Sequence, residues 1–142
     1  MANSDFHYYI IDDSKLDCTI AQKIIKASGV PEDQIACSVD ARESLKELTA
    51  LSAERADTIT IVFVDVRMPL MSGFEFIEAF EQFPESVRLP FRMYMLSSSI
   101  NESDMNRAKS YKSVSEFLNK PLTIAGIGKV TASLSEKIGA GL

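Results

Sequence analysis

The sequence Ile59-Thr60-Ile61-Val62-Phe63-Val64-Asp65-Val66-Arg67-Met68-Pro69 decides the fold of this chain. A run of β-branched and aromatic residues ends in one carboxylate, Asp65, and Pro69 stops the chain soon after. Apolar runs of this length are typical of a strand buried on both faces, as in a parallel sheet. A carboxylate at the C-terminal end of such a strand lies where open α/β sheets bind ligands.

Helical patterns and further strands alternate on both sides of this stretch. The predicted strands are Phe6–Ile11, Gln34–Val39, Ile59–Asp65, Phe91–Leu96 and Ser115–Asn119. The predicted helices cover about residues 16–28, 41–53, 73–83, 102–111 and 124–138, and residues 84–90, between two prolines, are expected to form a loop. Alternation at this spacing favours βαβ units, a parallel sheet and helices on both of its faces.

Two kinds of local signal support the helices. Leu16, Ile20 and Ile24 recur every fourth residue, as on the apolar side of an amphipathic helix. Asp40-Ala41-Arg42-Glu43 and Ser72-Gly73-Phe74-Glu75 have the form of capping boxes, in which a polar N-cap precedes a glutamate by three residues. The sequence therefore predicts an α/β protein, and its 142 residues suit a single domain.

Composition narrows the class of protein. With 46% hydrophobic and 25% charged residues, the chain resembles an ordinary globular protein. Its net charge of -5 argues against direct binding to nucleic acid, which needs basic surface. No signal peptide and no membrane span are visible, so we expect a cytoplasmic protein that does not contact membranes. Cys18 and Cys37 lack a metal-site spacing and are expected to be reduced thiols.

Side chains that could bind a ligand or take part in a reaction lie at the ends of the predicted strands. Asp12 and Asp13 follow the first strand, Asp65 ends the third, Ser97 follows the fourth and Lys120 follows the fifth. In a parallel sheet these ends meet at one edge. The sequence thus predicts three carboxylates close together, flanked by a hydroxyl group and an ammonium group.

This donor set favours a hard metal ion and phosphate chemistry. Neighbouring carboxylates repel one another unless a cation intervenes, and oxygen donors without nearby His or Cys favour Mg²⁺. Lys120 and Ser97 suit phosphoryl oxygens, as a point charge and as a hydrogen-bond donor. Asp65 is a candidate nucleophile, because a carboxylate can carry a phosphoryl group as an acyl phosphate.

The chain resembles the receiver domain of response regulators in two-component signalling, over about residues 6–138. The motifs that carry the resemblance are Ile11-Asp12-Asp13-Ser14, Asp65-Val66-Arg67-Met68-Pro69 followed by Gly73, Leu96-Ser97-Ser98, and Phe117 three residues before Lys120-Pro121. The resemblance implies a flavodoxin-like, doubly wound fold with three αβα layers. Its five-stranded parallel sheet would have the order 2-1-3-4-5, with five helices around it, and residues 1–142 would form one domain.

The resemblance also implies roles for the residues of the site. Asp65 would be the phosphorylation site, with Lys120 and Ser97 as the other catalytic side chains. Mg²⁺ would be bound by Asp12, Asp13, Asp65 and the backbone carbonyl of Arg67, with Asp12 acting mainly through water.

Further implied roles concern switching and lifetime. Ser97 would move to hydrogen-bond the phosphoryl group, and Phe117 would turn inward into the space released. Arg67 and Ser99 would tune the lifetime of the acyl phosphate. Ser98 is small, which leaves access to the site, and the Lys120–Pro121 bond is expected to be cis.

These features predict a phosphoacceptor switch, not an enzyme acting on other substrates. The phosphoryl donor would be a sensor histidine kinase or a histidine phosphotransfer protein. Because the chain ends after its last helix, we expect a stand-alone receiver whose output passes through an unidentified partner protein, through homodimerisation on phosphorylation, or through onward phosphotransfer. The output face would include exposed parts of Asn101–Tyr111 and Thr123–Lys137.

Three alternatives stay open at this stage. A Mg²⁺-dependent phosphohydrolase would use Asp65 as its nucleophile, but such enzymes usually carry a second acid just after it, where this chain has Val66 and Arg67. A flavodoxin-like cofactor binder would need a phosphate cradle where Asp12 and Asp13 stand. A degenerate receiver would act only as an interaction module without phosphorylation.

Overall fold

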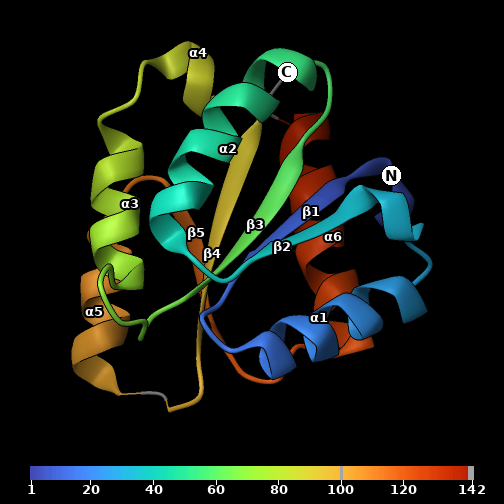
Figure 1. Cartoon of the computed structure of the whole chain (residues 1–142). Helices are drawn as coiled ribbons and strands as arrows, with labels where there is room; N and C mark the ends of the chain where they lie inside the picture. Colours follow the sequence, from blue (N-terminus) through green and yellow to red (C-terminus); the bar gives the residue numbers. More distant parts are fainter. Residues whose placement is uncertain (100, 141–142) are drawn as a thin grey trace.

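A five-stranded parallel sheet forms the centre of the protein in the computed structural model, which describes residues 1–99 and 101–140 (Figure 1). The strand order is β2-β1-β3-β4-β5, as the resemblance implied. The strands are β1 (His7–Ile11), β2 (Ile35–Ser38), β3 (Thr60–Asp65), β4 (Phe91–Ser97) and β5 (Val114–Asn119).

Helices cover both faces of this sheet and complete a three-layer fold. They are α1 (Lys15–Ala27), α2 (Ala41–Glu54), α3 (Gly73–Glu81), α4 (Glu85–Arg88), α5 (Glu102–Lys109) and α6 (Ile124–Ala140), with 3-10 turns at Asn3–Asp5 and Glu32–Gln34. In Figure 1, α1 and α6 lie on one face of the sheet, and α2, α3 and α5 lie on the other. The predicted α/β fold is therefore confirmed.

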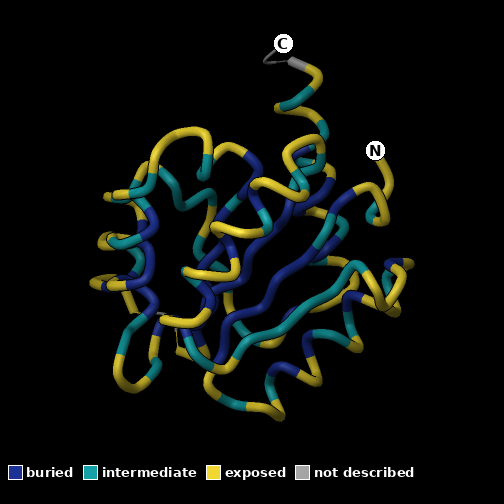
Figure 2. Tube along the Cα trace, turned by 45° about the horizontal axis from the view of Figure 1, so that its top comes forward, coloured by how far each residue is buried: buried dark blue, intermediate teal, exposed yellow. Residues whose placement is uncertain are grey.

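The core consists of two apolar clusters, one on each face of the sheet. Successive residues of β1 alternate between them: Tyr8 and Ile10 pack toward α1 and α6, whereas Tyr9 and Ile11 pack toward α2 and α3. Every residue of β3 is buried, so the strand that opened the sequence analysis is the centre of the core. Figure 2 shows the inner strands β1, β3 and β4 as the buried interior, whereas the edge strands β2 and β5 are only partly buried and the exposed positions lie mainly on the outer sides of the helices.

Two local predictions differ from the structure. Residues 84–90 are not all loop, because the single-turn helix α4 follows Pro84, with the Arg88 N–H donating to the Pro84 carbonyl. A proline is tolerated at the start of a helix because its missing N–H has no partner there. The capping box forms at Ser72 and Glu75, whereas Asp40 caps α2 by accepting from the Arg42 N–H.

The prediction of two reduced cysteines was wrong. Cys18 on α1 and Cys37 on β2 are joined by a disulfide, with their Cα atoms 6.2 Å apart. The β1–α1–β2 unit packs the inner side of α1 against β2, which brings together two residues that are 19 positions apart in the sequence. Spacing alone carries no sign of this pairing.

Within residues 1–99 and 101–140, no helix combines the length and the apolar character that a membrane span needs.

Candidate phosphoacceptor site

Three carboxylates meet at the C-terminal edge of the sheet. Asp12 follows β1, Asp13 is next to it, and Asp65 is the last residue of β3. An oxygen atom from each lies within 4.8 Å of the others. Parallel pairing of Ile11 with Val64 places the two strand ends side by side, so the sheet register creates this cluster. Asp12 and Asp65 are buried, whereas Asp13 is exposed.

Asp12 is held by contacts to both of its oxygens. Its Oδ1 accepts a hydrogen bond from the Ser14 N–H at 3.0 Å, and its Oδ2 accepts one from Lys120 Nζ at 2.6 Å. Ser14 is also the N-cap of α1, where its hydroxyl accepts from the Asp17 N–H at 3.2 Å. The turn after β1 therefore orients the acidic pair and starts the helix at the same time.

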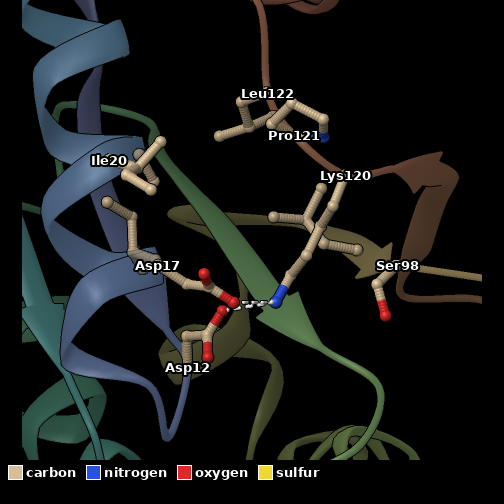
Figure 3. Close-up of a pocket in the computed structure, with 10 residues that line it drawn as sticks. Asp12, Asp17, Ile20, Ser98, Lys120, Pro121 and Leu122 are labelled. Atoms are coloured by element: carbon tan, nitrogen blue, oxygen red, sulfur yellow. Dashed lines mark hydrogen bonds and ion pairs between the residues drawn. The ribbon is translucent and has the colours of Figure 1, made fainter.

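Lys120 reaches the cluster from the end of β5. Its Nζ lies 2.6 Å from Asp12 and 3.0 Å from Asp17 (Figure 3). The distance from Nζ to the Asp65 carboxylate is 3.3 Å. Burial of the ammonium opposes its charge, but hydrogen bonds to Asp12 and Asp17 and the charge of Asp65 outweigh burial and raise the pKa of Lys120 above its usual value. Lys120 is thus a fixed positive charge beside Asp65. The following bond, Lys120–Pro121, is cis as predicted.

Asp65 is a weaker acid than an ordinary aspartic acid side chain. Burial raises the pKa of Asp65 to about 6; the charge of Lys120 opposes this rise, and the charges of Asp12 and Asp13 add to it. In the absence of a further cation, the three carboxylates disfavour simultaneous ionisation. A bound divalent cation would lower the pKa of Asp65 again and so favour its ionised form.

The start of α3 approaches the backbone of Asp65 very closely. The Gly73 N–H donates to the Val66 carbonyl at 2.9 Å. A Cβ atom at position 73 would lie 2.4 Å from the Asp65 carbonyl oxygen, closer than any side chain tolerates. The glycine of the motif therefore allows the helix to support the strand end that carries Asp65.

Ser97 ends β4, and Phe117 lies on the neighbouring strand β5. The Ser97 hydroxyl is buried and donates to the Ser99 carbonyl at 2.6 Å. Phe117, on β5, is half-buried and lines a cavity of about 250 Å³ together with Met105 and Ala108 of α5. There is free volume beside the ring, and the hydroxyl has a local acceptor. Ser98 and Ser99 are exposed, and the switching roles stay predictions.

The Arg67 side chain is bound by α5. Its Nη2 donates to Asp104 Oδ2 at 2.7 Å, and this oxygen also accepts from Asn101 Nδ2 at 3.1 Å. Asp104 is buried, whereas the Arg67 side chain is 68% exposed. A role of Arg67 in the lifetime of an acyl phosphate therefore involves its partner Asp104. The metal-binding role of its carbonyl stays a prediction.

The cluster fits the ion that the sequence implied. Its donors are all carboxylate oxygens, two of them buried, and they converge within the 4.8 Å that a single ion can bridge. Hard oxygen donors of this kind suit Mg²⁺, which keeps several water molecules. Asp12, Asp13 and Asp65 are the side chains that would hold it.

The sequence patterns did not predict two acidic residues of this region, Asp17 and Asp104. Asp17 lies in the first turn of α1, directly after the N-cap region, and belongs to none of the motifs that carry the resemblance. Asp104 lies in the first turn of α5, far along the chain from Arg67. The rule that places site residues at the ends of parallel strands does not cover helix residues that face the same edge of the sheet.

Comparisons with known proteins agree with this geometry. The family model described as "Response regulator receiver domain" matches residues 9–131. A two-component response regulator from Cytophaga hutchinsonii has a similar structure, with a TM-score of 0.83 and 23% identity over 94% of this chain and 98% of that one. A response regulator receiver protein from Dyadobacter fermentans has a TM-score of 0.79 and 28% identity, covering 90% and 96% of the two chains.

A longer protein also contains a similar region. The chain is 22% identical over 122 residues to the "Hybrid signal transduction histidine kinase L" of Dictyostelium discoideum, which covers 85% of this chain but only 7% of the kinase. Since the family match extends over most of the sequence and coincides with the acidic cluster, the chain belongs to the response regulator receiver domain family.

Proposed function

We propose that this protein is a phosphoacceptor signalling switch in which Asp65 receives a phosphoryl group from the phosphohistidine of a sensor kinase or a histidine phosphotransfer protein. The observation that carries the proposal is the surrounding of Asp65: Lys120 Nζ lies 3.3 Å away, and two further carboxylates converge with Asp65 within 4.8 Å. A nucleophilic carboxylate, a fixed cation and an oxygen-donor cluster are the parts that phosphoryl transfer to an aspartate requires.

The transfer is a displacement at phosphorus. A carboxylate oxygen of Asp65 forms the new O–P bond while the P–N bond of the phosphohistidine breaks, and the imidazole leaves with the electron pair. Lys120 stabilises the charge on the phosphoryl oxygens. Bound Mg²⁺ would supply further positive charge at those oxygens. Ser97 would exchange its hydrogen bond to Ser99 for one to the phosphoryl group.

The output of the switch would lie on the side of Phe117. When Ser97 turns toward Asp65, the ring of Phe117 would occupy space beside β4, which shifts an existing equilibrium between two arrangements of α5, β5 and α6. We propose that an output partner protein, or a second copy of the chain, binds this face. The protein would act in the cytoplasm as one domain with a core at about 6–138, without catalysing a reaction of another substrate.

Intact-mass measurement tests this function. The wild-type chain is incubated with a small phosphodonor in Mg²⁺ and, separately, in excess chelator. We expect one added phosphoryl group in Mg²⁺ and none in chelator or in Asp65→Asn. The matched control is Asp57→Asn, which removes one exposed carboxylate before β3, at the opposite edge of the sheet. A wild-type chain that stays unmodified in Mg²⁺ would contradict the proposal.

A further inference from the structure

Asp17 is the closest neighbour of the site that no motif accounts for. It belongs to the first turn of α1, and its Oδ2 accepts a hydrogen bond from Lys120 Nζ at 3.0 Å. Its side chain is 43% exposed, whereas that of Lys120 is 16% exposed. In Figure 3, Lys120 extends toward Asp12 and Asp17, and the two carboxylates lie together on one side of its ammonium.

The contacts of Lys120 are unequally divided. Its shortest contacts are the hydrogen bonds to Asp12 and Asp17, at 2.6 and 3.0 Å. Asp65 is the most distant of the three carboxylates, at 3.3 Å. An ammonium group carries a single positive charge, so each carboxylate beside it compensates part of that charge and draws the group in its own direction. Asp17 therefore competes directly with Asp65 for Lys120.

We infer that Asp17 is a positioning residue that holds Lys120 back from the phosphoacceptor and so slows the phosphorylation of Asp65. The inference rests on the proposed function. In the unmodified protein, Asp17 draws the ammonium toward α1 and partly neutralises it. It also adds a negative charge at the edge of the sheet where an anionic phosphodonor must enter. Both effects oppose transfer.

A simpler role for Asp17 is also available. An acidic residue in the first turn stabilises a helix through its dipole. That role makes Asp17→Asn slightly less stable and leaves the reactivity of Asp65 unchanged. The two roles therefore predict different results, because release of Lys120 accelerates the chemistry whatever happens to stability.

Phosphorylation rates separate the two roles. With acetyl phosphate and saturating Mg²⁺, we expect Asp17→Asn to be phosphorylated roughly three- to tenfold faster than wild type. The reason is that the substitution removes a negative charge next to the Lys120 ammonium. Asp17→Glu, which keeps the charge, should stay near the wild-type rate. Asp57→Asn, with the same change in net charge at the opposite edge of the sheet, should do so too.

The dependence on Lys120 is tested by combining substitutions. In a Lys120→Gln background, the acceleration by Asp17→Asn should largely disappear, because the residue through which Asp17 acts is absent. An undiminished acceleration in that background would overturn the inference, since Asp17 would then act only by its own charge on the donor.

A second measurement does not depend on phosphorylation or on the Lys120 variant. The ¹⁵N resonance of the Lys120 ammonium reports its hydrogen bonds directly. We expect this resonance to shift, and its protons to exchange faster with water, in Asp17→Asn but not in Asp57→Asn. An unchanged resonance, or an unchanged or slower phosphorylation rate, overturns the inference while the proposed function stands. Failure of the wild-type chain to accept any phosphoryl group overturns both.

Discussion

Arg67 donates a hydrogen bond to Asp104 at 2.7 Å, and this ion pair joins the loop after Asp65 to the first turn of α5. Asp104 is buried and has one other side-chain donor, Asn101. The pair therefore connects the proposed site of phosphorylation to the helix proposed as part of the output face. A substitution at Arg67 therefore removes a contact that joins this loop to α5.

Removal of Arg67 is expected to destabilise the start of α5. In Arg67→Ala the nearly buried Asp104 carboxylate loses its charged partner, and we expect a loss of about 1 kcal/mol in the free energy of unfolding, together with faster amide exchange in α5. The control is Arg42→Ala, since Arg42 pairs with Asp40 at 3.2 Å on an exposed surface, where little change is expected. Equal effects of the two substitutions, by urea denaturation, would contradict this prediction.

The raised pKa of Asp65 predicts that its replacement by asparagine stabilises the protein in a pH-dependent way. The pKa of Asp65 is about 6 in the folded protein and 3.8 without its surroundings. Between these values the folded state binds more protons than the unfolded state, so the contribution of Asp65 to stability falls as pH rises through this window. Without Mg²⁺, Asp65→Asn should therefore be more stable than wild type above pH 6, by about 1 to 2 kcal/mol.

Urea denaturation of wild type and Asp65→Asn across this window measures the effect. The difference in the free energy of unfolding should approach zero near pH 4 and be largest near pH 8. Asp57→Asn, at an exposed position, should show no such gain. A less stable Asp65→Asn at the upper pH would show that the contact with Lys120 outweighs the burial of the carboxylate.

Alanine substitutions at Gly73 and Gly128 are expected to change the stability of the protein in opposite directions. Because a Cβ at position 73 would lie 2.4 Å from the Asp65 carbonyl oxygen, Gly73→Ala must displace backbone. We expect a loss of about 1 to 3 kcal/mol in stability and slower phosphorylation of Asp65. Gly128→Ala, in helix α6, meets no atom within 4 Å and should gain about 0.5 to 1 kcal/mol. Thermal unfolding of both variants checks these signs, and a neutral Gly73→Ala would refute the proposed close approach.

The Cys18–Cys37 disulfide predicts a redox-dependent stability. It closes a loop with a sequence separation of 19, and removing such a cross-link costs about 3 kcal/mol through the entropy of the unfolded chain. Oxidised wild type should therefore unfold at higher urea than either the reduced protein or Cys37→Ser. Reductant should not affect Cys37→Ser, which serves as the control. In a cytoplasm, where thiols are kept reduced, the less stable form would be the working one. Equal midpoints for oxidised and reduced wild type would contradict the prediction.

Local patterns in the sequence correctly predicted much of the fold. The apolar run that ends at Asp65 marked a strand buried on both faces, and every residue of β3 is buried. The strand-end rule correctly brought Asp12, Asp13 and Asp65 together, because parallel strands place their C-terminal ends at one edge. Lys120 reached the same edge for the same reason. The order of the strands came from the resemblance to receiver domains and from no local pattern.

Contacts between distant segments were outside the reach of these patterns. The Cys18–Cys37 bond depends on how α1 packs against β2, and the Arg67–Asp104 pair depends on where α5 begins relative to the loop after β3. Asp17 was missed because a single acid in a first helical turn has an ordinary local explanation. The short helix α4 was missed because two prolines framed it.

The sequence by itself determined the period of each element, the burial of the central strand and the chemical nature of the residues at the sheet edge. These are local properties, since periodicity and residue type act over a few neighbouring positions. Only the tertiary structure decided how Lys120 divides its contacts among Asp12, Asp17 and Asp65, and which partner Arg67 binds. Such choices depend on differences of a few tenths of an ångström between the distances that separate these side chains. The packing of the elements against one another sets those distances.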